Sequence, residues 1–266
     1  MNNHNQRRII VKKALFAALI LFSAVLSVFS TGMKEDKMKE GDGMKVYVFA
    51  SDATWPPMEY VDDNGDIVGF DMDLLAAVAA ASGFEYEVRN TGWDGIFAGL
   101  ANGSYDAVIS SVTITEERKA SMDFSAPYIN AGQILVVPAD YSGGAMLDDF
   151  SGMKVGVQQG TTGDFAVEEL ASIDRRAYDD IGLAVEDLVN GNIDAVVCDS
   201  VTAIDYVAAN ENFIGKLKVI GEPFTEEEYG IAVQKGNEEL LNLINAGLEK
   251  VFADGTQAKL VEKWLR

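Results

Sequence analysis

The sequence predicts an α/β fold built from two lobes of similar architecture. Segments with the alternation typical of strands take turns with Ala/Leu-rich helical segments, which favours mainly parallel sheets. A weak internal repeat supports the two lobes. Residues 44–48 (MKVYV) recur as residues 153–157 (MKVGV), and residues 103–111 (GSYDAVISS) recur as residues 191–199 (GNIDAVVCD). Both copies of the second pattern follow a helical stretch that ends in Asn-Gly.

Local patterns predict the elements of the first lobe in order. Residues 44–50 (MKVYVFA) are β-branched or aromatic at alternate positions, which indicates a strand. Asn64-Gly65 lies between two apolar segments and predicts a hairpin. The acids around it resemble a calcium loop only faintly, because the glycine is misplaced for an EF-hand. The apolar segments of the hairpin and the elements expected after it are strands 58–61 and 67–70, helix 71–82 ended by Gly83, strand 84–89, helix 93–102 ended by Gly103 and strand 106–110.

The composition excludes several classes of function. The chain has 266 residues, of which 48% are apolar, and a net charge of −21. The length suits one large or two medium domains, and the acidity argues against a nucleic-acid binder. The single histidine, His4, lies at the extreme N-terminus, in a segment that we expect to be removed, and a mature chain without histidine excludes a Ser-His-Asp triad, a Cys-His dyad and a His-rich zinc site. The single cysteine, Cys198, excludes an intrachain disulfide. We therefore expect no metal and no cofactor.

The N-terminal segment has the order of a secretory signal. Residues 1–13 carry basic residues without an acid, residues 14–29 are uncharged, and small residues follow up to Gly32. We expect a signal peptide over residues 1–30, a flexible tether over residues 31–44, and an exported protein. The alternative is an uncleaved anchor, although the apolar run is short for a membrane span of about 20 residues. No cysteine follows the run, so a lipoprotein signal is not expected.

Two turns could bind an anion. In residues 110–118 a strand ends, hydroxyl groups cluster and a helix begins near Thr115. Arg118 is a cation near that helix N-terminus, which is unfavourable unless an anion is bound there. The guanidinium fork suits a carboxylate, while the alternative is a salt bridge from Arg118 to a neighbouring acid. Residues 156–164 form a second Gly/Thr turn with exposed amides, and the alternative there is a plain strand-to-helix turn.

Three further residues are candidates for ligand contact. Asp199 follows a strand over residues 195–198, where it could pair with an ammonium group or cap a helix over residues 201–209. Trp55 and Trp93 are expected near loops and could hold a ligand between their rings, with core packing as the alternative. The repeat places Ser111 and Asp199 at equivalent strand ends. If the lobes face each other, both residues line one cleft.

Seven ordered motifs after residue 46 resemble those of the periplasmic polar amino-acid-binding proteins of ABC importers, the family 3 solute-binding proteins. This resemblance implies a periplasmic-binding-protein-like fold of type II, with a hinge between lobes at 45–131 plus 227–266 and at 132–226. The motifs are TWPPMEY (54–60), GFDMDL (69–74), DAVI (106–109), TITEER (113–118), DFSAPY (123–128), VGVQQGTT (155–162) and GNIDA (191–195).

The resemblance also implies roles for ten residues. For the ligand carboxylate they are Arg118, Ser111 and Thr162. For the ligand amino group they are Asp199 and Thr113. For the ligand side chain they are Asp52, Trp55, Trp93, Ser110 and Gln158.

The implied function is the extracytoplasmic, non-catalytic component of an ABC importer. The expected partners are an L-amino acid and an ABC permease in the inner membrane, with no nucleic acid, and the chain is expected to be a monomer. Asp52 and Glu59 with two tryptophans favour a basic amino acid, arginine or lysine. Glutamine or another polar amino acid is the alternative. An alternative of a different class is a periplasmic dehydratase-like enzyme, with Asp52, Glu59 or Asp199 as a general acid.

Overall fold

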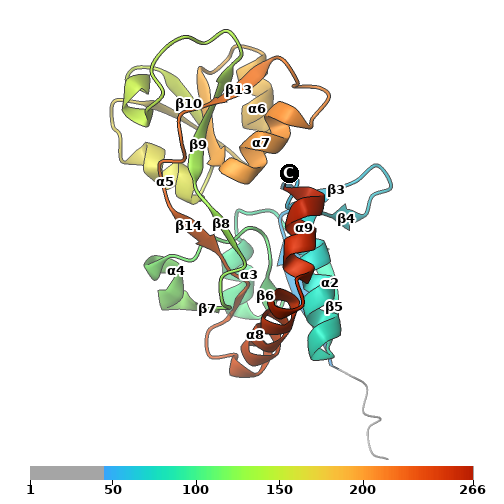
Figure 1. Ribbon diagram of the computed structural model, residues 1–266. Helices are drawn as coiled ribbons and strands as arrows, with labels where there is room; N and C mark the ends of the chain where they lie inside the picture. The colour runs from blue at the N-terminus through green and yellow to red at the C-terminus, as the bar shows by residue number, and fades with distance from the viewer. Residues whose placement is uncertain (1–44, 266) are drawn as a thin grey trace, which may run out of the picture. The chain divides into compact units, whose positions relative to one another are not determined.

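The computed structural model describes residues 45–265. The signal peptide and the tether expected over residues 1–30 and 31–44 therefore lie outside the described residues. The described chain folds as one compact unit with two five-stranded sheets, each forming the centre of a lobe (Figure 1). This is the two-lobed α/β architecture that the sequence predicts.

The first lobe is built on a sheet in the order β5-β1-β6-β15-β7. Its central strand β1 pairs in parallel with β5 and β6, whereas β15 pairs antiparallel with β6 and β7. The strands are β1 (Val46–Ser51), β5 (Glu85–Asn90), β6 (Ala107–Val108), β7 (Met122–Phe124) and β15 (Ala232–Gln234).

The second lobe repeats this arrangement in the order β11-β10-β12-β9-β13. Here β10 pairs in parallel with β11 and β12, and β9 pairs antiparallel with β12 and β13. The two copies of the sequence repeat thus occupy equivalent strands, β1 with β6 and β10 with β12. The strands are β9 (Gln133–Pro138), β10 (Lys154–Gln158), β11 (Asp174–Tyr178), β12 (Ala195–Asp199) and β13 (Leu217–Ile220).

Four of the five strands in each sheet run in the same direction, which agrees with the prediction of mainly parallel sheets. The strands that join each sheet after the chain has crossed between lobes, β9 and β15, run in the opposite direction. The crossings themselves are β8 (Ile129–Ala131) and β14 (Glu227–Tyr229), which pair with each other in a two-stranded ribbon. These crossings are consistent with the lobe limits expected from the sequence, which stay a prediction.

Helices cover both sheets. In the first lobe α2 packs on α8 and α9, and these helices share a core with β1 (Figure 1). In the second lobe α6 and α7 cover one face and α5 the other. The helices are α2 (Phe70–Ser82), α3 (Ile96–Asn102), α4 (Glu116–Ser121), α5 (Thr162–Glu168), α6 (Ile181–Val189), α7 (Ser200–Ala208), α8 (Glu238–Ala253) and α9 (Thr256–Trp264), with a 3₁₀ turn η1 at Leu147–Phe150.

Most predicted boundaries agree with the structure within a few residues. The predicted hairpin is the pair β3 (Glu59–Val61) and β4 (Ile67–Val68), joined to β2 (Thr54–Trp55) in a three-stranded sheet. The helix expected from Trp93 begins only at Ile96, because Gly95 before it is left-handed with φ 98°. Gly69, which precedes α2, must be glycine: its φ is 135° and a Cβ atom would lie 2.2 Å from the Met58 carbonyl oxygen.

No helix among residues 45–265 is both long enough and apolar enough to cross a membrane.

Candidate functional site

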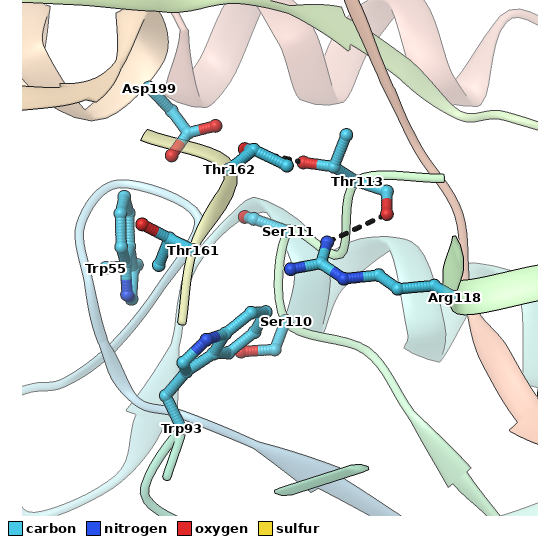
Figure 2. Close-up of a pocket in the computed structure, with 9 residues that line it drawn as sticks. All are labelled: Trp55, Trp93, Ser110, Ser111, Thr113, Arg118, Thr161, Thr162 and Asp199. Carbon is cyan, nitrogen blue, oxygen red and sulfur yellow. Dashed lines mark hydrogen bonds between the residues drawn. The ribbon is translucent and has the colours of Figure 1, made fainter. Parts of the chain in front are cut away.

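One pocket collects most of the residues predicted to contact a ligand (Figure 2). Together they surround about 260 Å³ of space not filled by atoms, part of which is open to solvent. Eight of the ten predicted residues line it, and Thr161 is the one lining residue that the sequence analysis did not predict. The predicted residues in the lining are Trp55, Trp93, Ser110, Ser111, Thr113, Arg118, Thr162 and Asp199.

Arg118 brings a buried guanidinium to the pocket. It lies in α4, where Thr115 caps the helix by accepting a hydrogen bond from the Arg118 amide. Its Nη1 donates to the Thr113 carbonyl at 2.9 Å, and Nη2 contacts the Gly160 carbonyl at 3.5 Å. The guanidinium carbon lies 5.4 Å from the Trp93 ring centre and 5.0 Å from that of Phe97. Such packing holds the fork in place.

The salt bridge considered as an alternative for Arg118 does not occur among the described residues. The side chain is only 8% exposed, and this burial lowers the pKa of the guanidinium, against the charges of Glu227 and Asp199. A guanidinium has five N–H donors, and only two of its contacts within the described chain are hydrogen bonds. Arg118 can therefore bind an anion in the pocket.

Asp199 brings a buried carboxylate from the end of β12. The helix α7 starts directly after it, but its side chain makes no capping hydrogen bond. Oδ1 instead accepts from the Tyr229 hydroxyl at 2.6 Å and from Gln133 Nε2 at 3.1 Å. Burial, together with the charge of Glu227, raises the pKa of Asp199 to about 7. Figure 2 shows this carboxylate and the Arg118 guanidinium entering the pocket from different sides.

The two tryptophans both line the pocket and pack against the protein. Trp55 belongs to the core cluster of the second lobe, although β2 lies in the first half of the chain. Trp93 makes an edge-on contact with Phe97, with ring centres 4.9 Å apart. Both side chains are therefore placed for ligand contact and also contribute to packing in the protein interior.

Asp52 and Gln158 are the two predicted residues that do not line the pocket. Gln158 Nε2 donates to Asp52 Oδ2 at 2.8 Å, which joins the end of β10 in the second lobe to the end of β1 in the first. Thr54 donates to the other Asp52 oxygen, and the Asp52 amide donates to the Ser110 hydroxyl. Burial raises the pKa of Asp52. The carboxylate thus lies next to a lining residue but is engaged by the protein.

A pair of buried acids lies behind the two serines. Glu59 accepts from the hydroxyls of Ser110 at 3.0 Å and Ser111 at 3.2 Å. Asp71 accepts from the Ser111 amide and from the Tyr128 hydroxyl, both at 2.9 Å. Burial raises the pKa of Glu59 well above its ordinary value, helped by Asp71, and burial raises the pKa of Asp71 to about 6.

These two acids hydrogen-bond to the loop at Ser110 and Ser111, which is strained, and neither of them lines the pocket. Ser111 has a φ of 48°, in the left-handed region that non-glycine residues rarely adopt. The Asp71 carboxylate holds its amide in that conformation. The expectation that Glu59 faces a cationic side chain is wrong for this structure, because Glu59 is fully buried behind the serines.

Glu227, which was not predicted from the sequence, has its carboxylate directly behind the pocket. Its Oε2 accepts from Thr113 at 2.7 Å and from Thr162 at 2.8 Å. Residues 226–228 are three consecutive glutamates, a pattern typical of a solvent-exposed acidic segment. A weak signal was available: Glu227 and Tyr229 alternate on β14, and both are buried.

Comparisons with known proteins agree with the two-lobed α/β fold. Residues 47–266 match the bacterial extracellular solute-binding proteins, family 3. The chain is 39% identical to a probable histidine-binding protein of Neisseria gonorrhoeae over 96% of each chain. It is 36% identical to the L-cystine-binding protein TcyJ of Escherichia coli K12, over 93% of this chain and 91% of that protein. It also resembles the structure of an ancestral arginine-binding protein bound to arginine, with a TM-score of 0.80 and 42% identity over 84% of this chain and 100% of that one.

Proposed function

Because this chain belongs to the family 3 bacterial extracellular solute-binding proteins, we propose that it binds a basic amino acid, arginine or lysine, and delivers it to an ABC permease. The observation that carries the proposal is the buried Arg118 guanidinium, which has no ion pair in the described chain, in one pocket with the buried Asp199 carboxylate. An α-amino acid carries an anion and a cation on one carbon, so it complements both groups at once.

The residues divide into three groups in this proposal. Arg118 binds the ligand carboxylate, assisted by Ser111 and the backbone at Thr162. Asp199 and Thr113 bind the ammonium group. The side chain of the ligand lies among Trp55, Trp93, Ser110, Asp52 and Gln158.

The balance of charge supports a basic ligand. Two carboxylates beside the pocket, Asp52 and Glu227, add to Asp199 against the single cation Arg118. Gln158 Oε1 is buried without a hydrogen-bond partner among the described residues. The names of the relatives include histidine and arginine as well as cystine. Glutamine or another polar amino acid is the alternative, because the Asp52 carboxylate is already engaged by Gln158.

We also propose that the lobes, residues 45–131 plus 227–266 and residues 132–226, close over the ligand about the ribbon of β8 and β14. Closure requires contacts to both lobes. Trp55 from the first lobe packs into the core cluster of the second, and the bond from Gln158 to Asp52 joins the same two lobes. In this proposal the protein is monomeric and extracytoplasmic, and the signal expected over residues 1–30 directs its export.

A second candidate is a dehydratase-like enzyme on the same fold. The observation that favours it is Asp199, whose pKa of about 7 suits a general acid. The relatives described above are binding proteins, which supports the first candidate. Formation of product from a prephenate-like substrate would instead support the enzyme.

Thermal melts with a panel of ligands test the proposal. A ligand that binds only the folded protein raises its melting temperature by mass action. Arginine or lysine is expected to raise it most, and agmatine, which is arginine without the carboxylate, is expected to raise it little because it cannot engage Arg118. A shift with agmatine equal to that with arginine would contradict the role of Arg118, and no shift with any amino acid would contradict the proposed function.

A further inference from the structure

Glu227 connects the two lobes through two hydroxyl groups of the pocket. Thr113 follows the first-lobe strand β6, and Thr162 is the first residue of the second-lobe helix α5. Both donate to the same oxygen of Glu227, Oε2, at 2.7 and 2.8 Å, while Oε1 accepts from Thr225 at 2.9 Å. Glu227 itself is 8% exposed and does not belong to the pocket lining, whereas both threonines do.

The two threonines therefore present oxygen lone pairs to the pocket. A hydroxyl has one hydrogen, and in each threonine that hydrogen points to the Glu227 carboxylate. A carboxylate is the stronger acceptor for such a hydrogen, because hydrogen bonds to charged groups are the stronger ones. The third polar side chain at this end of the pocket, Asp199, also offers only lone pairs when it is ionised.

The side-chain donors near this end are directed at the same acceptors. Gln133 Nε2 lies 3.1 Å from Asp199 Oδ1, 3.1 Å from Thr162 Oγ1 and 3.4 Å from Glu227 Oε2. The Tyr229 hydroxyl donates to Asp199. What remains for a ligand is a set of acceptors, and the group that satisfies several acceptors at once is a protonated amine with three N–H bonds.

We propose that Glu227 is a positioning residue for ligand selection: it keeps the hydroxyl hydrogens of Thr113 and Thr162 out of the cleft, so that this end of the cleft selects a protonated α-amino group. The inference rests on the proposed function and adds a residue to it. It also divides the role of Thr162, whose hydroxyl faces the ammonium group while only its backbone amide remains for the ligand carboxylate.

The test compares Glu227→Gln with the unmodified protein on two ligands. L-Arginine carries the α-amino group, and 5-guanidinopentanoate is the same molecule without it. The glutamine side chain has nearly the same shape, but its amide donates and can turn the threonine hydrogens toward the cleft. We expect the affinity for arginine to fall about 10- to 100-fold, the size of a lost hydrogen bond to a charged group, and the affinity for 5-guanidinopentanoate to change much less.

Glu228→Gln is the matched control. Glu228 is the next residue on β14 and is exposed, so this variant removes the same charge from the strand and is expected to bind both ligands normally. Competition at millimolar concentrations measures the weaker ligand. If L-histidine is the tighter ligand, it replaces arginine and imidazole-4-propanoate is its partner.

Three outcomes separate the possibilities. Equal losses for both ligands, or no loss for arginine, would overturn the inference and leave Glu227 a structural link between lobes. An unmodified protein that binds no amino acid would overturn the proposed function instead. If Glu227→Gln fails to fold, Thr162→Val keeps the side-chain shape and removes a hydroxyl that only this inference assigns to the ammonium group. The inference predicts the same loss for arginine alone.

Discussion

Replacing Arg118 with alanine is expected to reduce the affinity for an amino acid by about thirtyfold to several-thousandfold. The range comes from the burial of this group and from its lack of an ion pair within the described chain. Removing one partner of a buried, hydrogen-bonded charge pair costs about 2–5 kcal/mol, and each 1.4 kcal/mol is a factor of ten in the binding constant. Most of the loss is the penalty of leaving the ligand carboxylate buried without a cation.

The structure also predicts that the ligand-free variant stays folded. Arg118 makes one hydrogen bond of ordinary length, to the Thr113 carbonyl, and its burial already disfavours the charged form. Arg118→Lys keeps a charge but loses the planar fork, so its affinity is expected to lie between those of the unmodified protein and the alanine variant. Arg89→Ala is the control, because the Arg89 side chain is 52% exposed and pairs with Glu87 on the surface.

The assay is calorimetric titration with the preferred amino acid, together with a melt of each ligand-free variant. A loss below 1 kcal/mol for Arg118→Ala, about fivefold in affinity, would refute the carboxylate role. So would an equal loss for Arg89→Ala. A variant that melts far below the unmodified protein would show that Arg118 supports the fold, and the Arg118→Lys titration would then carry the test.

Four further predictions concern the buried acids. Asp52→Asn is expected to weaken arginine binding far more than glutamine binding, because the carboxylate is proposed to face a distal cation, and equal losses in paired titrations would contradict this. With a pKa of about 7, Asp199 loses its charge as the pH falls, so affinity measured between pH 8 and pH 5 is expected to fall about tenfold per unit below pH 7. In the ligand-free protein the raised pKa values of Asp199 and Asp71, about 7 and about 6, favour the protonated forms. The stability that these forms contribute is present at acid pH and is lost as the pH rises through 6 to 7; a melting temperature that instead increases from pH 5 to pH 8 would oppose the assignment. Glu59→Gln is expected to leave the free energy of unfolding nearly unchanged in urea titrations, since the raised pKa keeps Glu59 neutral. Asp71→Asn replaces the carboxylate acceptor of two hydrogen bonds with a neutral amide oxygen and is expected to cost about 1–3 kcal/mol. The reverse order would show that the charge of the pair lies on Glu59.

Local signals in the sequence were sufficient for much of the fold. The helix α2 lies within one residue of the predicted range, because Gly83 ends it in a left-handed conformation and no β-branched run interrupts it. The internal repeat located the equivalent strands of the two lobes. Nothing local indicates that β9 and β15 enter their sheets antiparallel, because that direction is decided by where the chain crosses between lobes.

Local sequence patterns also located only part of the candidate site, because some of its contacts join residues that are distant in the sequence. Arg118, Ser111 and Asp199 stand at strand ends or helix starts, positions that a sequence pattern can locate. The bond between Gln158 and Asp52 joins residues 106 positions apart, and the bond between Glu227 and Thr113 joins residues 114 positions apart. The first pair joins the two lobes, and the second joins distant segments of one lobe, so no local pattern reveals either of them. A buried acid such as Glu227 resembles a surface acid in the sequence.

Calorimetric titration of ligand-stripped residues 31–266 with arginine, lysine, histidine, glutamine and glutamate tests the central claim most directly. We expect submicromolar binding of arginine or lysine, with much weaker binding of glutamine. Tight glutamine binding without arginine binding would contradict the specificity, and the absence of binding for all five would contradict the amino-acid site built on Arg118 and Asp199.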